Sequence, residues 1–264
     1  MASGGFSYKA EYSQPNTEIN FFPVCVDNFF TDPDIIRTWG LSLPKNPSKE
    51  GSWPGLRSAS LHDINEEVHI TLILKILSSY FDLKFTDVSW DSASIMFQET
   101  TPYDRNDDIL NQGWIHQDKE DDLAGLIYLT PDANPDSGTS LFNIKKDRQK
   151  DFLHFTRQVE KHAFYKGENI KQEDYVRALT EHNNFFYEKT RFANIYNRMI
   201  MYDSNEYHRA NTVNAGNDPR LTLVFFINGI KTGDDRFPVQ KVVDRTNFDS
   251  KLISRIKSIG ESHA

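Results

Sequence analysis

Two histidines and one aspartate are spaced so that they could bind a transition-metal ion. His116 and Asp118 are separated by one residue in the segment Trp114-Ile115-His116-Gln117-Asp118. In extended backbone, residues i and i+2 project to the same side of the chain, so both side chains can face one cavity. His208, 90 positions beyond Asp118 (208 minus 118), is the candidate for a third ligand. Two imidazoles and one carboxylate can occupy one face of an Fe(II) ion and leave the opposite positions open, which is a catalytic arrangement.

The segments around these residues decide what the spacing means, because a His-x-Asp triplet on its own is common by chance. Five segments rich in apolar or β-branched residues are predicted as strands. They are Ser94–Thr100, Leu123–Leu129, Thr139–Phe142, Arg198–Tyr202 and Arg220–Ile227. The fourth ends at the polar turn Asp203-Ser204-Asn205 and delivers His208 just beyond it. Arg220 and Thr222 share one face of the fifth.

This succession of strands and polar residues resembles the double-stranded β-helix core of the Fe(II)/2-oxoglutarate oxygenases, particularly the prolyl-4-hydroxylase-like branch. The resemblance covers about Ser94 to Ile227, with gaps. It implies an α+β, mainly β, fold with a jelly-roll or cupin-like core. It also implies that His116, Asp118 and His208 bind Fe(II) and that 2-oxoglutarate and O₂ are cosubstrates. The implied reaction hydroxylates a C–H bond of a substrate and releases succinate and CO₂.

Four further residues gain a role from the same resemblance. Arg220 is placed to bind the distal carboxylate of 2-oxoglutarate, and a planar guanidinium can donate two parallel hydrogen bonds to such a group. Thr222 is placed to add a hydroxyl donor. Tyr128 matches a tyrosine that reaches the same carboxylate in some hydroxylases, although it could equally be a half-buried strand tyrosine with its hydroxyl at the surface. Gln98 lies where the family often has another cosubstrate contact, commonly a tyrosine.

Two other classes of function remain open. A cupin-like metalloenzyme would bind a divalent ion yet ignore 2-oxoglutarate, and the pair of Arg220 and Thr222 speaks against it. A catalytically silent β-helix that only binds a partner would need neither the three ligands nor the arginine. The substrate, a peptidyl residue such as proline or a small molecule, is not fixed by the sequence, because similar barrels accept many substrates.

The composition of the whole chain predicts a soluble cytoplasmic enzyme. The 264 residues include one cysteine, Cys25, so no intramolecular disulfide can form, which fits a reducing compartment. A net charge of −8 argues against broad attraction to nucleic acid, which depends on Lys and Arg displacing counterions from phosphates. The polar N-terminus and the lack of a long apolar stretch predict neither a leader segment nor a membrane span.

The order of elements predicts a single domain over residues 1–264. Residues 1–92 are expected to support a core at 93–230, with a helical insertion at about 145–191 and a C-terminal extension at 231–264. Three helices are predicted outside the insertion. The first begins after Asp32, the second runs from about Asn65 to Phe81, and the third covers Lys251 to Ile259. Aromatic residues among charges predict two or three amphipathic helices in the insertion. It could close over the substrate, form a dimer contact or brace the sheet.

Overall fold

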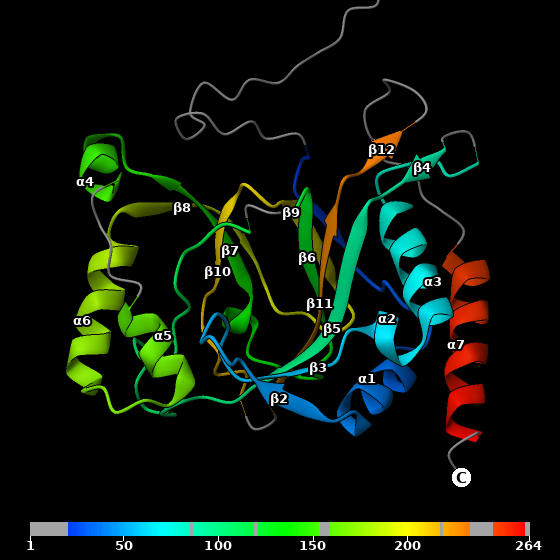
Figure 1. Ribbon diagram of the computed structural model, residues 1–264, viewed down its shortest axis with the longest axis horizontal. Helices are drawn as coiled ribbons and strands as arrows, with labels where there is room; N and C mark the ends of the chain where they lie inside the picture. The colour runs from blue at the N-terminus through cyan, green and yellow to red at the C-terminus, as the bar shows by residue number, and fades with distance from the viewer. Residues whose placement is uncertain are drawn as a thin grey trace, which may run out of the picture.

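A large antiparallel sheet forms the centre of the fold. The computed structural model describes residues 21–84, 87–118, 121–153, 159–216, 219–232 and 245–261 (Figure 1). The sheet has seven strands in the order β1-β9-β6-β11-β5-β3-β2, and every neighbouring pair is antiparallel. The strands are β1 Val24–Val26, β2 Lys45–Pro47, β3 Leu56–Ser58, β5 Ser92–Thr100, β6 Leu123–Tyr128, β9 Met199–Asp203 and β11 Arg220–Asn228.

A smaller antiparallel sheet carries His208, the predicted third ligand. Its order is β10-β7-β8, formed by Tyr207–Ala210, Thr139–Ile144 and Phe186–Phe192. A separate pair joins β4 (Val88–Ser89) to β12 (Lys231–Thr232). The five strands predicted from the sequence are confirmed as β5, β6, β7, β9 and β11.

One face of strand β11 packs in the hydrophobic core, and the other face lines a cavity. Leu221, Leu223, Phe225 and Ile227 belong to the main hydrophobic core, which also contains residues of the neighbouring helices. Side chains alternate across a strand, so the intervening residues face the other way. Of these, Arg220, Val224 and Phe226 line a cavity. This alternation fixes which face of the sheet can act on a ligand.

Three helices pack against the core face of the large sheet: α1 (Pro33–Ser42), α2 (Leu61–Ile64) and α3 (Glu66–Leu77) (Figure 1). Helix α7 (Arg245–Glu261) packs on the outer side of α3. The side chain of Asp32 accepts a hydrogen bond from the Ile35 N–H, and Asn65 likewise caps α3. The predicted starts of both helices are therefore confirmed. The prediction of a mainly β chain is wrong, since seven α-helices accompany the strands in the described residues.

The interval 145–191 is only partly helical. It contains α4 (Gln149–Leu153), α5 (Val159–Lys166) and α6 (Gln172–Asn183), as the aromatic residues among charges predict. The expectation is wrong over Phe186–Phe192, which forms strand β8 at the edge of the small sheet. Most of the residues of β8 are at least partly exposed, so its sequence lacks the hydrophobic alternation that reveals a half-buried strand.

The segment from Leu43 to Arg57 is rich in Pro and Gly, a composition typical of loops, yet it contains the short strands β2 and β3. The predicted C-terminal helix is confirmed and is longer than expected, as α7. Residues 1–20 and 233–244, which belong to the expected N-terminal support and C-terminal extension, lie outside the described residues. In the part of the chain that is described, no helix has the length and apolar character needed to cross a membrane.

Candidate metal centre

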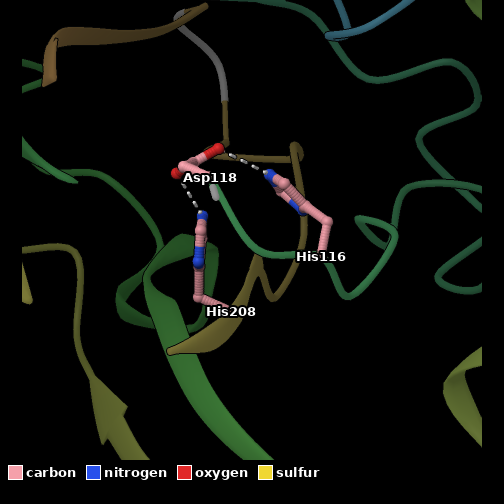
Figure 2. A group of neighbouring side chains, drawn as sticks. All are labelled: His116, Asp118 and His208. Atoms are coloured by element: carbon pink, nitrogen blue, oxygen red, sulfur yellow. Dashed lines mark ion pairs between the residues drawn. The ribbon is translucent and has the colours of Figure 1, made fainter. Parts of the chain in front are cut away.

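The side chains of His116, Asp118 and His208 converge on one point. Figure 2 shows them pointing toward one another, with His116 and Asp118 on one stretch of backbone and His208 on another. One ligand atom from each lies within 4.8 Å of the other two. Nε2 of His208 is 3.1 Å from Oδ2 of Asp118, and Nε2 of His116 is 3.8 Å from Oδ1. One ligand atom from each of the three residues is therefore close enough to the others to bind the same divalent ion.

Backbone hydrogen bonds hold the three residues together. His116 and His208 form an isolated antiparallel bridge, in which the N–H of each donates to the carbonyl of the other at 3.0 and 2.9 Å. The N–H of Asp118 donates to the carbonyl of Ser204 at 2.9 Å, in the turn before β10. The apolar residues before His116 do not form a strand, because residues 101–115 contain turns and no strand. Pairing with β10 therefore positions the His-x-Asp segment.

Each histidine ring is fixed in one tautomer. Nδ1 of His116 lies 2.8 Å from the carbonyl of Trp114, and Nδ1 of His208 lies 2.9 Å from the carbonyl of Glu206. Because a carbonyl oxygen only accepts, each ring donates its proton from Nδ1 and keeps a lone pair on Nε2. Such hydrogen bonds orient a ligand ring and increase its basicity. Both rings are therefore ready to bind a metal ion through Nε2.

The charges at the centre favour an ionised aspartate. Burial raises the pKa of Asp118, but His208 and His116 lower it by more, so the pKa stands below its ordinary value. Burial lowers the pKa of His208, but the Asp118 carboxylate raises it by more. Enclosure in the cavity and the neighbouring His208 lower the pKa of His116. The site therefore presents a carboxylate and at least one neutral imidazole.

The centre lies in the wall of a cavity of about 380 Å³. Both sheets line this cavity: Leu126 and Val224 come from the large sheet, and Thr139 and His208 come from the small one. Helix α5 and the segment 52–57 complete its wall. Sites for small molecules span about 300–1,000 Å³, so the cavity is large enough for a small organic ligand beside the three converging side chains.

Arg220 reaches the same cavity from the first residue of β11. It is 4 % exposed, and its Nε donates to the carbonyl of Ser137 at 2.9 Å. Its guanidinium carbon lies 5.6 Å from the centroid of the Tyr128 ring. Among the residues that the structure describes, its Nη2 is buried without a hydrogen-bond partner. Such a donor is costly unless something accepts from it, so this position suits an acceptor that a ligand supplies.

Tyr128 and Thr222 lie near Arg220, but the hydroxyl group of each already donates a hydrogen bond to another residue of the protein. Tyr128 is fully buried, and its hydroxyl donates to Oγ1 of Thr139 at 2.9 Å. The alternative of a half-buried tyrosine with a surface hydroxyl is therefore wrong. The Thr222 hydroxyl donates to the Gln98 carbonyl at 3.4 Å. A direct contact between either residue and a cosubstrate stays a prediction. Thr139 also lines the cavity with its hydroxyl group, and the sequence did not predict it as a site residue.

Gln98 lines the cavity, but its side-chain amide already has two partners. Oε1 accepts from Nε of Arg57 at 3.0 Å, and Nε2 donates to the carbonyl of Pro54 at 3.0 Å. Gln98 therefore orients Arg57, and its expected contact with a cosubstrate stays a prediction.

Two cations of the cavity, Arg57 and Lys161, do not stand out in the sequence. Arg57 lies on β3, in a segment that predicts a loop, and Lys161 lies on α5, where a lysine is typical of a solvated helix face. Burial lowers the pKa of Arg57 to about 10, against the opposing effect of Asp118. Burial also lowers the pKa of Lys161, again opposed by Asp118. Neither residue belongs to a recognisable motif, and only the fold brings them to the cavity.

His182 of α6 supports the metal-binding segment from outside, and it should make the fold sensitive to acid. Its Nε2 donates to the Ile115 carbonyl at 2.7 Å, and burial lowers its pKa from 6.5 to about 4, against the effect of that carbonyl. Between these values the unfolded chain binds a proton that the folded chain does not. Stability present above pH 6.5 should therefore be lost as the pH falls, by roughly 3 kcal/mol in total.

Urea unfolding of wild type and His182→Gln at pH 7, 6 and 5 checks this expectation. The variant keeps a side-chain donor but cannot titrate, so its unfolding free energy should fall less steeply with pH. Equal slopes for His182→Gln and wild type would contradict the assignment.

Comparisons with solved structures and protein families place the chain as follows. HygX from Streptomyces hygroscopicus, with nickel and 2-oxoglutarate bound, shares 11% identity over 79% of this chain and 84% of HygX, with a TM-score of 0.43. A prolyl-4-hydroxylase from Pseudomonas putida shares 12% identity over 78% of this chain and 92% of that chain, with a TM-score of 0.41. A comparison with curated proteins finds no match. A family model matches residues 18–227, and the chain therefore belongs to the family of unknown function DUF6445.

Proposed function

We propose that the chain is an Fe(II)- and 2-oxoglutarate-dependent dioxygenase that hydroxylates a C–H bond of a small molecule or a peptidyl residue. One observation carries this proposal: the ligand atoms of His116, Asp118 and His208 converge at the same cavity that Arg220 lines, and Nη2 of Arg220 has no partner in the described residues. Two imidazoles and a carboxylate with open positions are the donor set of non-haem Fe(II) oxygenases. On this proposal the two facing sheets are the double-stranded β-helix. Assignment to the prolyl-4-hydroxylase-like branch rests on the resemblance of the strands and polar residues in the sequence and stays a prediction.

The residues of the cavity fit both absent groups. His116, Asp118 and His208 would hold the iron, and Arg220 would bind the distal carboxylate of 2-oxoglutarate through the donor that has no protein partner. When bound, iron and 2-oxoglutarate would supply oxygen activation coupled to decarboxylation of the cosubstrate to succinate. Ser137 and Tyr128 hold the guanidinium in place, so little freedom is lost when a carboxylate binds.

Arg220 also separates this proposal from the two other classes. A cupin-like metalloenzyme that ignores 2-oxoglutarate would have no use for a buried guanidinium with a free donor. A silent binding module would have no use for two imidazoles that present Nε2 to an ionised carboxylate. Both alternatives leave costly buried groups without a partner, and the oxygenase does not.

An anaerobic titration tests the proposed function. Fe(II) and 2-oxoglutarate together should produce the weak visible charge-transfer band of an iron chelate, and neither should do so alone. Admission of O₂ should then release succinate, only in the presence of both. If the band is absent although Fe(II) binds, the cupin-like alternative takes its place. If Fe(II) does not bind, no oxygenase function remains.

A further inference from the structure

The cavity is positively charged in an acidic protein. Its ionisable lining, apart from the two histidines and the two tyrosines, consists of Arg57, Lys161 and Arg220 against the single carboxylate of Asp118. The chain as a whole carries a net charge of −8. An excess of two positive charges inside such a protein is a local feature that folding has assembled from three distant segments. Charge that converges on a cavity is typical of a site for an oppositely charged ligand.

Arg57 is held rigidly at this cavity without an acidic partner. Its Nε donates to Oε1 of Gln98, and its guanidinium carbon lies 4.3 Å from the ring centroid of Trp53 and 5.7 Å from that of Phe226. In the described part of the chain, no carboxylate forms an ion pair with it. A stacked guanidinium that is pinned along one edge keeps its outer N–H groups for a planar anion. Arg57 is therefore preorganised to bind one.

Lys161 approaches the cavity from α5, which is anchored on the opposite loop. Nδ1 of the adjacent His162 lies 2.8 Å from the carbonyl of Glu50. A Cβ on Gly51 would lie 2.3 Å from the backbone oxygen of His162, so only glycine permits this approach. Across the described ranges the side-chain Nζ of Lys161 has no ion pair or hydrogen bond. Nε1 of Trp53 in the same wall is buried, and the described residues offer it no partner either. The groups left without partners here are all donors.

A count of charges shows what remains after the proposed cosubstrate has bound, and this step rests on the proposed function. A divalent metal ion (+2), Asp118 (−1), Arg220 (+1) and 2-oxoglutarate (−2) sum to zero. Arg57 and Lys161 then keep two positive charges, enclosed with the site and without a counter-charge. Both side chains are half-buried, and leaving a partly desolvated charge unpaired is costly, so a negative group on the substrate would remove that cost.

We propose that the substrate is a small organic anion whose carboxylate or phosphate group is bound by Arg57 and Lys161. The apolar or aromatic remainder of the molecule packs against Trp53 and Phe226, which lie in the same wall. The anionic group fixes the orientation of the substrate, and the remainder is presented to the metal centre. This proposal names a chemical class of substrate that the cosubstrate site does not determine.

Binding of matched probes to the protein tests this class. Isothermal titration calorimetry would compare 3-phenylpropanoate and phenyl phosphate with 3-phenylpropan-1-ol and 3-phenylpropylamine, each on the protein saturated with Zn(II) and 2-oxoglutarate, where no turnover occurs. One of the two anions should bind at least about tenfold more tightly than the alcohol, because a charge-assisted hydrogen bond contributes about 1.5–3 kcal/mol. The amine should bind most weakly. Whichever anion binds more tightly identifies the group as a carboxylate or a phosphate.

Variants locate the binding site. Arg57→Gln and Lys161→Gln should each weaken the preferred anion by about tenfold or more, while Lys161→Arg should retain most of the affinity. Lys166→Gln, on the same helix but outside the cavity, should bind as wild type does. If Arg57→Gln fails to fold, Lys161→Gln still tests the site, and Lys161→Arg is its charge-retaining control. The proposal is overturned if the alcohol binds as well as the anions, or if neither Gln variant weakens binding.

The same titrations separate this proposal from the proposed function. If Zn(II) and 2-oxoglutarate do not bind, but the anion binds in a manner that depends on Arg57 and Lys161, the oxygenase proposal fails and the anion site stands. If 2-oxoglutarate competes with the anion and depends on Arg57 and Lys161 instead of Arg220, the substrate proposal fails and those cations belong to the cosubstrate.

Discussion

Replacing Asp118 with alanine is expected to abolish succinate release and to weaken Fe(II) binding by more than about 100-fold. Loss of a residue that merely orients a metal ligand already costs about 10- to 100-fold in affinity, and Asp118 is the only anionic group among the three ligand atoms. The two remaining imidazoles would keep their Nδ1 hydrogen bonds to Trp114 and Glu206, since those do not involve Asp118. The variant should therefore lose the metal without losing its local backbone structure.

Calorimetric titration with Fe(II) under anaerobic conditions, together with succinate release in air, measures this loss. Asp136→Ala is the matched control, because Asp136 has a side chain that is 75% exposed and lies outside the cavity. It should bind Fe(II) and release succinate as wild type does. An Asp118→Ala variant that retained wild-type affinity for Fe(II) would show that the three side chains do not act as ligands of one ion.

The three residues that converge at the candidate metal centre could be predicted from sequence because local rules constrain them. The spacing of His116 and Asp118 has a meaning in any extended backbone, and the apolar run before Asp203 marks a strand whose end brings His208 into position. Arg220 was predictable for a related reason. It begins a strand in which every second residue packs in the core, so the face on which Arg220 lies was already determined.

Arg57 and Lys161 could not be found in this way, because long-range contacts alone place them. Arg57 reaches the cavity because β3 pairs with β5, which sets Arg57 opposite Gln98. Nothing in a segment rich in Pro and Gly signals that two of its short pieces add to a sheet. Lys161 is indistinguishable in sequence from the surface lysines of other amphipathic helices. Its position depends on the contact between His162 and the loop at Glu50.

Strand β8 was missed for a different physical reason. As the edge of the small sheet it pairs only with β7, and residues such as Glu188 and Arg191 form an ion pair at the surface. Charged edges protect a sheet from further pairing, yet they also remove the apolar alternation by which a strand is recognised. Edge strands are thus the elements that a single sequence reveals least, whereas the buried strands β6 and β9 were evident.

Replacing Arg220 with glutamine is expected to raise the dissociation constant of 2-oxoglutarate by about 10- to 100-fold, which corresponds to the 1.5–3 kcal/mol of a hydrogen bond to a charged group. The dissociation constant of the metal should stay within about twofold of the wild-type value, because Arg220 is not one of the converging ligand residues. The effect is large because the buried Nη2 of Arg220 has no partner in the described residues and is free to bind the cosubstrate. Glutamine lacks both the positive charge and the paired N–H donors of a guanidinium.

Titration of 2-oxoglutarate into the Zn(II)-loaded protein measures this change directly, and a separate Zn(II) titration measures the metal. Arg220→Lys should recover part of the affinity, since it keeps the charge but offers no bidentate geometry. Arg191→Gln, on the exposed strand β8, is the control and should leave both constants unchanged. Unchanged 2-oxoglutarate affinity in Arg220→Gln would remove Arg220 from the cosubstrate site. A parallel loss of metal affinity would mean that its effect on the cavity is structural, because a residue that binds only the cosubstrate has no reason to alter metal binding in its absence.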